Sequence, residues 1–189
     1  MLENIVLEIA KDSDIDGILD LQELYLVSNL SEEEKIAGFV TTPFTVPLLE
    51  YVISQNGIFI AKLNNKIIAY AFAASWEFFS QYPIFEYMIS LFPRFQFKDF
   101  ELNTTNSFQY GPVCIHKNYR GQGLIKILFE FMRINTLEKY PLAVTFINKI
   151  NIPSTKAHVE KLKWTIIDEF SFNNNQYIVL AYDMNVAVD

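Results

Sequence analysis

Residues 113–125 read Val-Cys-Ile-His-Lys-Asn-Tyr-Arg-Gly-Gln-Gly-Leu-Ile, and this stretch decides the fold. The run 108–116 predicts a strand, 117–123 a polar turn, and the apolar stripe of 124–137 a helix. That order puts glycines at a helix start, where the first backbone N–H groups lack partners and the helix dipole is positive. Glycines let a ligand approach the backbone closely, so the sequence predicts a diphosphate site to which Arg120 could add charge.

Two common phosphate-binding loops are missing from the sequence. It contains no Gly-x-x-x-x-Gly-Lys-Ser/Thr segment, and Gly121-Gln122-Gly123 lacks the third glycine of a dinucleotide-binding fingerprint. A P-loop NTPase and a Rossmann enzyme are therefore excluded. An ordinary tight turn between a strand and a helix would also account for the glycines, so the interpretation depends on the rest of the chain.

Length and composition favour one folded domain. The chain has 189 residues, of which 51% are apolar and 20% are charged, enough for one continuous core. Because no linker, repeat or low-complexity tract interrupts it, we expect a single domain over residues 1–189. The formal charge of -7 argues against nucleic acid as a partner, since phosphate backbones are bound by Lys and Arg.

The sequence also favours a cytoplasmic protein with no membrane partner. Cys114 is the single cysteine, so an internal disulfide cannot form. The first residues show no signal-peptide pattern, and no apolar run reaches the roughly 20 residues that a membrane-spanning helix needs.

Outward from the loop, the patterns predict alternating strands and helices. Asn64-Asn65 lies between two β-rich runs, and Asn173-Asn174-Asn175 lies between two others, so each run of asparagines predicts the turn of a hairpin. The predicted strands are 6–9, 57–63, 66–72, 108–116, 142–147, 164–170 and 176–184. The predicted helices are 15–24, 124–137 and 153–162, with two further helix starts at Ser31 and Pro47.

The segment from Trp76 to Asn106 is dense in aromatic residues without a clean period, and Pro83 and Pro93 divide it into short pieces. Three interpretations stay open for it: a wall of a substrate pocket, an interface of a homodimer, or an extra layer of core.

Arg120, Gly123 and Ile125 stand where the GNAT superfamily of N-acetyltransferases has an Arg/Gln-x-x-Gly-x-Gly/Ala loop that binds the pyrophosphate of acetyl-CoA. Residues 119–124 resemble the commonest form of that loop, whereas Ile125 replaces the usual small residue. The order of the predicted elements over most of the chain is also similar to that family. The resemblance implies an α/β (α+β) fold with a mixed, mostly antiparallel sheet of about seven strands and about four flanking helices.

The resemblance also implies acetyl-CoA as a co-substrate. Its thioester would lie along residues 113–115, whose backbone N–H groups can polarise the carbonyl. Residues 151–154 resemble a second family segment, Asn-x-x-Ser/Ala, that contacts CoA. The implied cofactor-binding residues are Val113, Cys114, Ile115, Arg120, Gly121, Gln122, Gly123, Leu124, Ile125, Asn151 and Ser154.

The implied activity is transfer of an acetyl group to a primary amine of a small molecule or peptide, by direct attack in a ternary complex. Such an amine has a pKa near ~10.4, so a base must remove its proton. Glu77 is the first candidate, unless it is only an exposed loop acid. The remaining candidate bases are Glu86, Asp99 and Glu101.

His158 follows Asn151 by seven residues, a position near the CoA sulfur where many members have tyrosine or histidine. Protonated, it could donate to the leaving thiolate, as water could; an ordinary helix histidine is the alternative. Residues 160–164 stand one residue later than the family spacing and lack its glycine, so Val159 could occupy this position instead.

The other candidate groups have simpler interpretations. Cys114 lies on an expected buried strand with no paired base, and His116 follows the strand end, so both are expected to be structural. Two histidines and one cysteine without ligand spacing predict no metal site. The rival function is a non-catalytic acyl-CoA-binding sensor or partner-interaction module on the same fold. The acceptor amine and the oligomeric state stay open.

Overall fold

The computed structural model describes residues 4–188. Its strands are β1 (Val6–Ile9), β2 (Ile58–Leu63), β3 (Lys66–Ala74), β4 (Gln96–Phe97), β5 (Phe100–Glu101), β6 (Ser107–Ile115), β7 (Leu142–Asn148), β8 (Thr165–Phe172) and β9 (Asn175–Asp183). Its helices are α1 (Ile15–Glu23), α2 (Glu32–Lys35), α3 (Val46–Ser54), α4 (Trp76–Phe79), α5 (Pro83–Ser90), α6 (Leu124–Thr136) and α7 (Ile152–Lys156).

Seven of these strands form one sheet in the order β1-β2-β3-β6-β7-β9-β8, and β4 pairs with β5 separately. β6 and β7 are parallel, whereas β1–β2, β2–β3, β7–β9 and β8–β9 are antiparallel. The prediction of a mixed, mostly antiparallel α/β fold is therefore confirmed.

By their internal contacts, the elements divide into two compact units. The first consists of the chain up to Ala73 together with Gly111–Met132. The second consists of Ala74–Tyr110 together with the chain from Arg133 onward. β6 and α6 contribute residues to both units.

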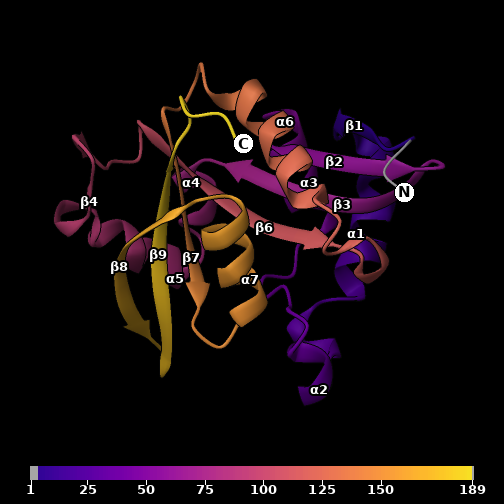
Figure 1. The fold of residues 1–189 in the computed structure, drawn as a ribbon, viewed down its shortest axis with the longest axis horizontal. Coiled ribbons are helices and arrows are strands. Elements are labelled where there is room, and N and C mark those ends of the chain that lie inside the picture. Colours follow the sequence, from indigo (N-terminus) through magenta and orange to yellow (C-terminus); the bar gives the residue numbers. More distant parts are fainter. Residues whose placement is uncertain (1–3, 189) are drawn as a thin grey trace. The chain divides into compact units, whose positions relative to one another are not determined.

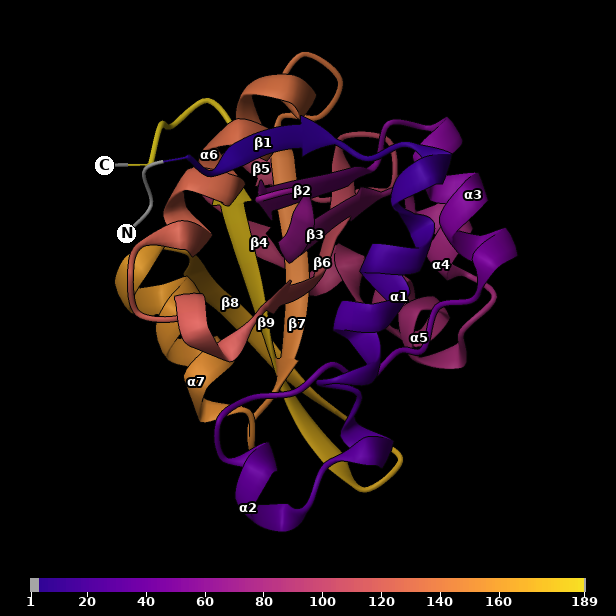
Figure 2. The same ribbon diagram turned by 90° about the vertical axis from the view of Figure 1, so that its right-hand side faces the viewer.

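In the first unit, α1 and α3 cover one face of strands β1–β3 and α6 covers the other (Figure 1, Figure 2). Phe59 of β2 packs edge-on against Phe131 of α6, with ring centroids 5.9 Å apart. Phe72 of β3 faces the opposite way and meets Phe44 at 4.7 Å. The turn between β2 and β3 holds Asn64-Asn65 at φ +50° and +62°, which confirms the predicted hairpin.

In the second unit, α5 and α7 lie on opposite faces of β7, β8 and β9 (Figure 1). Phe85 of α5 packs on Phe146 of β7 with centroids 4.9 Å apart. Trp164, which follows α7, packs on Tyr182 of β9 at 5.6 Å. The β8–β9 hairpin is also confirmed, because its turn holds Asn173 and Asn174 in the left-handed region.

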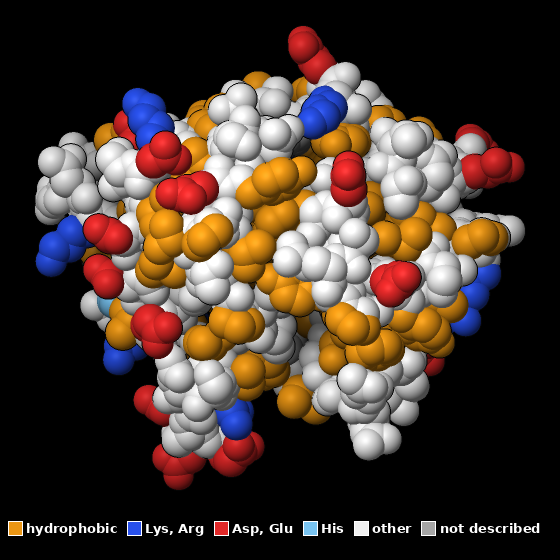
Figure 3. Space-filling model, turned by 180° about the vertical axis from the view of Figure 1, so that it is seen from behind, with side chains coloured by type: hydrophobic (Ala, Val, Ile, Leu, Met, Phe, Trp, Pro, Cys, Tyr) orange, Lys and Arg blue, Asp and Glu red, His pale blue; other side chains and the backbone are white. Residues whose placement is uncertain are grey.

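The aromatic segment from Trp76 to Asn106 folds into short pieces that include α4, α5, β4 and β5. Most of its rings form core of the second unit, which was one of the three open interpretations. The buried rings are those of Trp76, Phe78, Phe79, Phe85, Phe92, Phe95 and Phe97. Figure 3 shows hydrophobic side chains gathered across the middle of one face, with acidic and basic side chains mostly nearer its edges.

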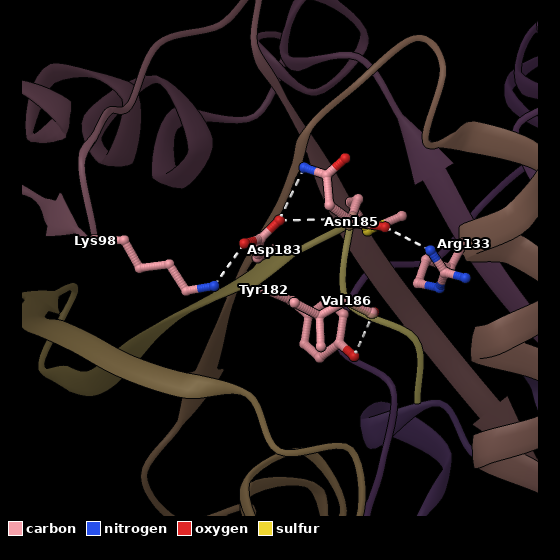
Figure 4. Close-up of polar contacts among 7 residues, drawn as sticks. Lys98, Arg133, Tyr182, Asp183, Asn185 and Val186 are labelled. Carbon is pink, nitrogen blue, oxygen red and sulfur yellow. Dashed lines mark hydrogen bonds and ion pairs between the residues drawn. The ribbon is translucent and has the colours of Figure 1, made fainter. Parts of the chain in front are cut away.

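Asp183 at the end of β9 and Met184 after it are held within the second unit by polar contacts (Figure 4). Arg133 Nη1 donates to the Met184 carbonyl oxygen at 2.6 Å. Lys98 Nζ lies 2.5 Å from Asp183 Oδ2. These bonds anchor the residues that follow β9.

None of the helices between residues 4 and 188 combines the length and the hydropathy that a bilayer-spanning segment needs.

Candidate functional site

The predicted diphosphate loop joins β6 to α6 in the first unit, and we call residues 116–125 the anion loop. Gly121 and Gly123 have φ angles of +74° and +85°, in the left-handed region that favours glycine. A Cβ atom at either position would meet no described atom within 4 Å. The glycines are therefore needed for the backbone conformation, and the space beside them is open to a ligand.

Backbone N–H groups line this open space. Among residues 4–188, none accepts a hydrogen bond from the backbone N–H groups of residues 121–125. The N–H groups on either side are engaged: Arg120 donates to the Lys117 carbonyl oxygen at 3.3 Å, and Lys126 donates to that of Gly123 at 3.0 Å. Helix α6 has 13 residues, so its dipole adds positive potential at this end. Consecutive free amides at a helix start suit an anion.

The Arg120 side chain does more in the fold than the sequence suggested. Its Nε donates to the Ile115 carbonyl oxygen at 2.7 Å, and its Nη1 donates to that of Ala37 at 2.6 Å. The guanidinium lies over the Tyr25 ring, 4.4 Å from the centroid. The charge thus stays next to the anion loop while two of its donors hold neighbouring backbone.

β6, the strand that leads into the anion loop, is irregular in its middle. β6 pairs with β7 at residues 107–109. Gly111 then has a φ of +101°, and Pro112 has no N–H to donate to a ladder. Beyond this interruption, Val113 and Ile115 are half-buried. The predicted thioester segment therefore follows a built-in irregularity of the strand.

Cys114 points the other way, into the interior of the first unit. Its Sγ lies 4.0 Å from the Leu21 carbonyl oxygen. Burial raises the pKa of its thiol to about 12, so the thiol is neutral at physiological pH. This environment agrees with the expected structural role and not with a nucleophile.

His116 caps the first turn of the anion loop. Its Nδ1 accepts the N–H of Asn118 at 3.3 Å, and its ring meets the Tyr25 ring edge-on at 6.2 Å. Burial lowers the pKa of His116, with the charges of Lys117 and Arg120 adding to the effect. These contacts agree with the structural role expected for it.

The second predicted CoA-binding segment lies in the second unit. Asn151 caps α7, because its Oδ1 accepts the N–H of Ser154 at 3.3 Å. The Ser154 carbonyl oxygen lies 2.7 Å from Nδ1 of His158. The structure thus brings these three predicted site residues together along the start of one helical segment.

His158 is buried, and burial lowers its pKa to about 4. Its ring packs edge-on against Tyr110 at 5.5 Å and against Trp164 at 5.7 Å. Because a carbonyl oxygen can only accept, Nδ1 carries the proton of the neutral ring. A neutral imidazole at pH 7 argues against the protonated donor that we predicted, so a catalytic role of His158 stays a prediction.

A π-helical turn over Ala157–Lys161 follows α7, with the Leu162 N–H donating to the Ala157 carbonyl oxygen at 3.1 Å. Such a turn contains one residue more than an α-helical turn. One extra residue in this turn equals the one-residue displacement from the resembled spacing noted at residues 160–164. Lys163 has a φ of +60° and stands where the family has glycine.

Glu77 is exposed on α4 in the second unit. It lines a surface hollow of about 500 Å³, to which Lys139 and Thr104 also contribute and which His158 does not line. The neighbouring Trp76 donates through Nε1 to Ser107 Oγ at 3.0 Å, so Glu77 adjoins the first residue of β6. The predicted thioester segment is the other end of that strand. The alternative bases Glu86, Asp99 and Glu101 are also exposed.

Sequence reasoning missed two contributors to the anion loop, the Tyr25 ring and the Ala37 carbonyl. Both act through contacts with Arg120 across more than eighty residues of chain, and neither belongs to a motif.

Within residues 4–188, no group of three His, Cys, Asp or Glu side chains could hold a metal ion.

No protein-family model matches the chain, and no curated protein matches it. Solved structures match it over nearly its whole length. The yncA structure from Salmonella typhimurium with its cofactor acetyl-CoA is 13% identical, with 96% of this chain and 95% of that chain covered and a TM-score of 0.63. A GNAT-family acetyltransferase from Streptococcus pneumoniae is 12% identical, with 95% and 98% covered and a TM-score of 0.61. A mutant agmatine N-acetyltransferase without ligand is 11% identical, with 96% and 100% covered and a TM-score of 0.66. The chain therefore has the GNAT fold.

Proposed function

We propose that this chain, whose fold is that of the GNAT N-acetyltransferases, transfers the acetyl group of acetyl-CoA to a primary amine of a small molecule or peptide. The observation that carries the proposal is the row of free backbone N–H groups at residues 121–125. They begin a long helix beside two left-handed glycines, as a site for a diphosphate requires. The acetyl-CoA bound by one structural neighbour supports this choice of anion.

Acetyl-CoA supplies the thioester when bound, and the chain's own groups would hold and polarise it. The amides of the anion loop would hold the pyrophosphate. Backbone N–H groups in residues 113–115 would donate to the carbonyl oxygen as charge develops on it. The half-buried Val113 and Ile115 suit contact with a ligand, and the buried Cys114 anchors the strand between them.

The amine acceptor must lose a proton before it can attack. Glu77, the base predicted from the sequence, adjoins Ser107, whereas residues 113–115 form the other end of β6, so we propose that water takes this proton first. A tetrahedral intermediate would then collapse with loss of the CoA thiolate. The neutral state of His158 favours water as the donor to that thiolate. Direct attack in a ternary complex requires no covalent enzyme intermediate, in keeping with the neutral thiol of Cys114.

Calorimetric titration of the purified protein with CoA and with acetyl-CoA tests the cofactor. We expect saturable binding by the native chain and none by Gly123→Glu, which puts a side chain and a negative charge where the phosphates would lie. Asn64→Glu is the matched control, since it introduces the same side chain at an exposed left-handed position in the β2–β3 turn. Equal CoA affinity in native protein and Gly123→Glu would remove the anion loop from the proposal.

Release of CoA from acetyl-CoA in the presence of an amine panel then tests the transfer. Glu77→Gln tests the base predicted from the sequence: turnover falls with an unchanged affinity for CoA only if Glu77 takes part, and Glu86→Gln is its control. Unaltered turnover of Glu77→Gln at every pH would exclude Glu77 as the base. CoA binding without turnover of any amine would favour the alternative function, a non-catalytic acyl-CoA sensor, to which the neutral His158 lends some support.

A further inference from the structure

Residues 26–40 leave the end of α1 and return beside it, and we call this segment the flap. Its two ends are joined, because the Val27 N–H donates to the Val40 carbonyl oxygen and the Val40 N–H donates to that of Tyr25, both at 2.8 Å. Between these ends, most side chains from Ser28 to Ala37 are exposed. Ile36 is 75% exposed. The middle of the flap therefore buries few side chains, although Asn29 Nδ2 donates to the Glu23 carbonyl oxygen at 3.1 Å and to Glu23 Oε2 at 2.7 Å.

Arg120 links this flap to the anion loop. Its Nη1 donates to the Ala37 carbonyl oxygen at 2.6 Å, in the exposed half of the flap. Its Nε donates to the carbonyl oxygen of Ile115, the last residue of β6, at 2.7 Å. One rigid, planar group thus bridges two segments that are far apart in the sequence.

Tyr25 contacts both Arg120 and the anion loop, and so supports the link between the anion loop and the flap. Its ring carries the guanidinium of Arg120 at 4.4 Å. Its hydroxyl accepts the N–H of Lys117, in the anion loop, at 2.7 Å. Tyr25 therefore holds both the beginning of the loop and the side chain that crosses to Ala37.

We propose that Arg120 is a positioning residue that couples the anion loop to the flap. It holds the loop in the conformation that presents its free amides, and an anion bound to those amides stabilises the flap in return, because coupling between two sites is reciprocal. This goes beyond a phosphate contact by Arg120. The identity of the anion rests on the proposed function, whereas the link itself belongs to the ligand-free protein.

The planar fork of arginine is central to the argument. Nε and Nη1 donate at the same time in two fixed directions while the plane stacks on a ring. A lysine at position 120 would keep the charge but could not make this arrangement. Arg120→Lys therefore separates positioning from charge.

The first experiment is hydrogen exchange of the full chain without ligand. In Arg120→Lys and in Tyr25→Leu we expect amides of residues 26–40 to exchange about tenfold faster, as the loss of a charge-assisted hydrogen bond allows. The β2–β3 hairpin should keep its native exchange rate. Arg94→Lys is the control, because Arg94 also donates to a carbonyl oxygen, that of Glu169 at 2.8 Å, in the second unit.

The second experiment adds inorganic pyrophosphate or CoA as the probe. Either anion should slow exchange of the flap in the native protein, and Arg120→Lys should bind CoA about tenfold more weakly, equivalent to about 1.4 kcal/mol. Affinity in Arg120→Lys should fall as steeply with added salt as in the native protein, since the charge is kept. The double variant Arg120→Lys/Tyr25→Leu should lose less binding free energy for CoA than the sum of the losses in the two single variants, because both substitutions act through one contact.

Unchanged flap exchange in both Arg120→Lys and Tyr25→Leu would overturn the proposal. If Arg120→Lys does not fold, Tyr25→Leu decides alone. A native protein that binds neither anion would defeat the proposed function, while faster flap exchange in the ligand-free variants would still establish the link. The two failures are thus distinguishable.

Discussion

Gln22 of α1 and Phe44 hold each other by two hydrogen bonds between a side chain and the backbone. Gln22 Nε2 donates to the Phe44 carbonyl oxygen at 3.1 Å, and Gln22 Oε1 accepts the Phe44 N–H at 2.8 Å. Both bonds are buried, and the Phe44 ring packs against Phe72 of β3. A single amide thus fixes the segment that precedes α3 against the first helix.

Replacing this amide should therefore lower stability strongly. Gln22→Leu has a similar size but leaves both Phe44 backbone groups without that partner, which should cost roughly 2 to 4 kcal/mol. Chemical denaturation measures the loss. Gln55→Leu is the control, because Gln55 is exposed and should change stability by about 0.5 kcal/mol or less. Equal effects of the two substitutions would show that the paired bonds contribute little.

Lys163→Gly should stabilise the protein. Lys163 is exposed with a φ of +60°, a conformation that costs a residue with a Cβ about 1 kcal/mol more than glycine. The midpoint of urea denaturation should rise for Lys163→Gly. Lys163→Ala keeps the Cβ and should not show this gain; a lower midpoint for the glycine variant would contradict the prediction.

Stability should fall as the pH drops from 6.5 towards 4, in part because of His158. Burial lowers its pKa from 6.5 to about 4, so in this window the unfolded chain binds a proton that the folded chain does not. The stabilisation is fully present above pH 6.5 and is lost as the pH falls, by roughly 3 kcal/mol in total.

Denaturation curves at several pH values test this for His158→Phe, which should be less stable at pH 7 but should depend less on pH between 6.5 and 4. Carboxylates titrate in the same window, so the difference between native and variant protein is the informative quantity. His116→Asn is the comparison: burial also lowers the pKa of this half-buried ring, so its removal should reduce the pH dependence less than His158→Phe does. An unchanged slope in His158→Phe would place the titration elsewhere.

Cys114 should react slowly with thiol reagents in the folded protein. Its pKa of about 12 and its burial keep the thiolate scarce and inaccessible. Labelling should become fast, at one thiol per chain, only after denaturation. Cys114→Ala should keep its affinity for CoA and any transferase activity; loss of turnover with CoA binding intact would reopen a covalent route.

Local patterns predicted the parts of the fold that depend on nearby residues. The asparagine pairs at 64–65 and 173–174 predicted both hairpins because left-handed turn residues are a local requirement. The strand, turn and helix around the anion loop were also predicted, since strand, glycines and amphipathic helix follow one another directly. The segment from Trp76 to Asn106 was not, because its elements have between two and eight residues, too few to show a period.

Contacts between distant residues explain what the sequence did not reveal about the site. Arg120 was predicted from its motif, but its contacts with Tyr25 and Ala37 depend on how the chain folds back. The burial that makes His158 neutral comes from Tyr110 and Trp164, on either side of it in the sequence. Spacing indicated the position of His158 and could not reveal its protonation state.

The wide turn at Ala157–Lys161 bears on how this chain could change in length during evolution. An added residue that is accommodated within one helical turn leaves the register between β8 and β9 unchanged. A slip by one position would turn every side chain of a strand to the opposite face of the sheet. A residue taken up within this turn thus leaves unchanged which side chains of β8 and β9 face the hydrophobic core.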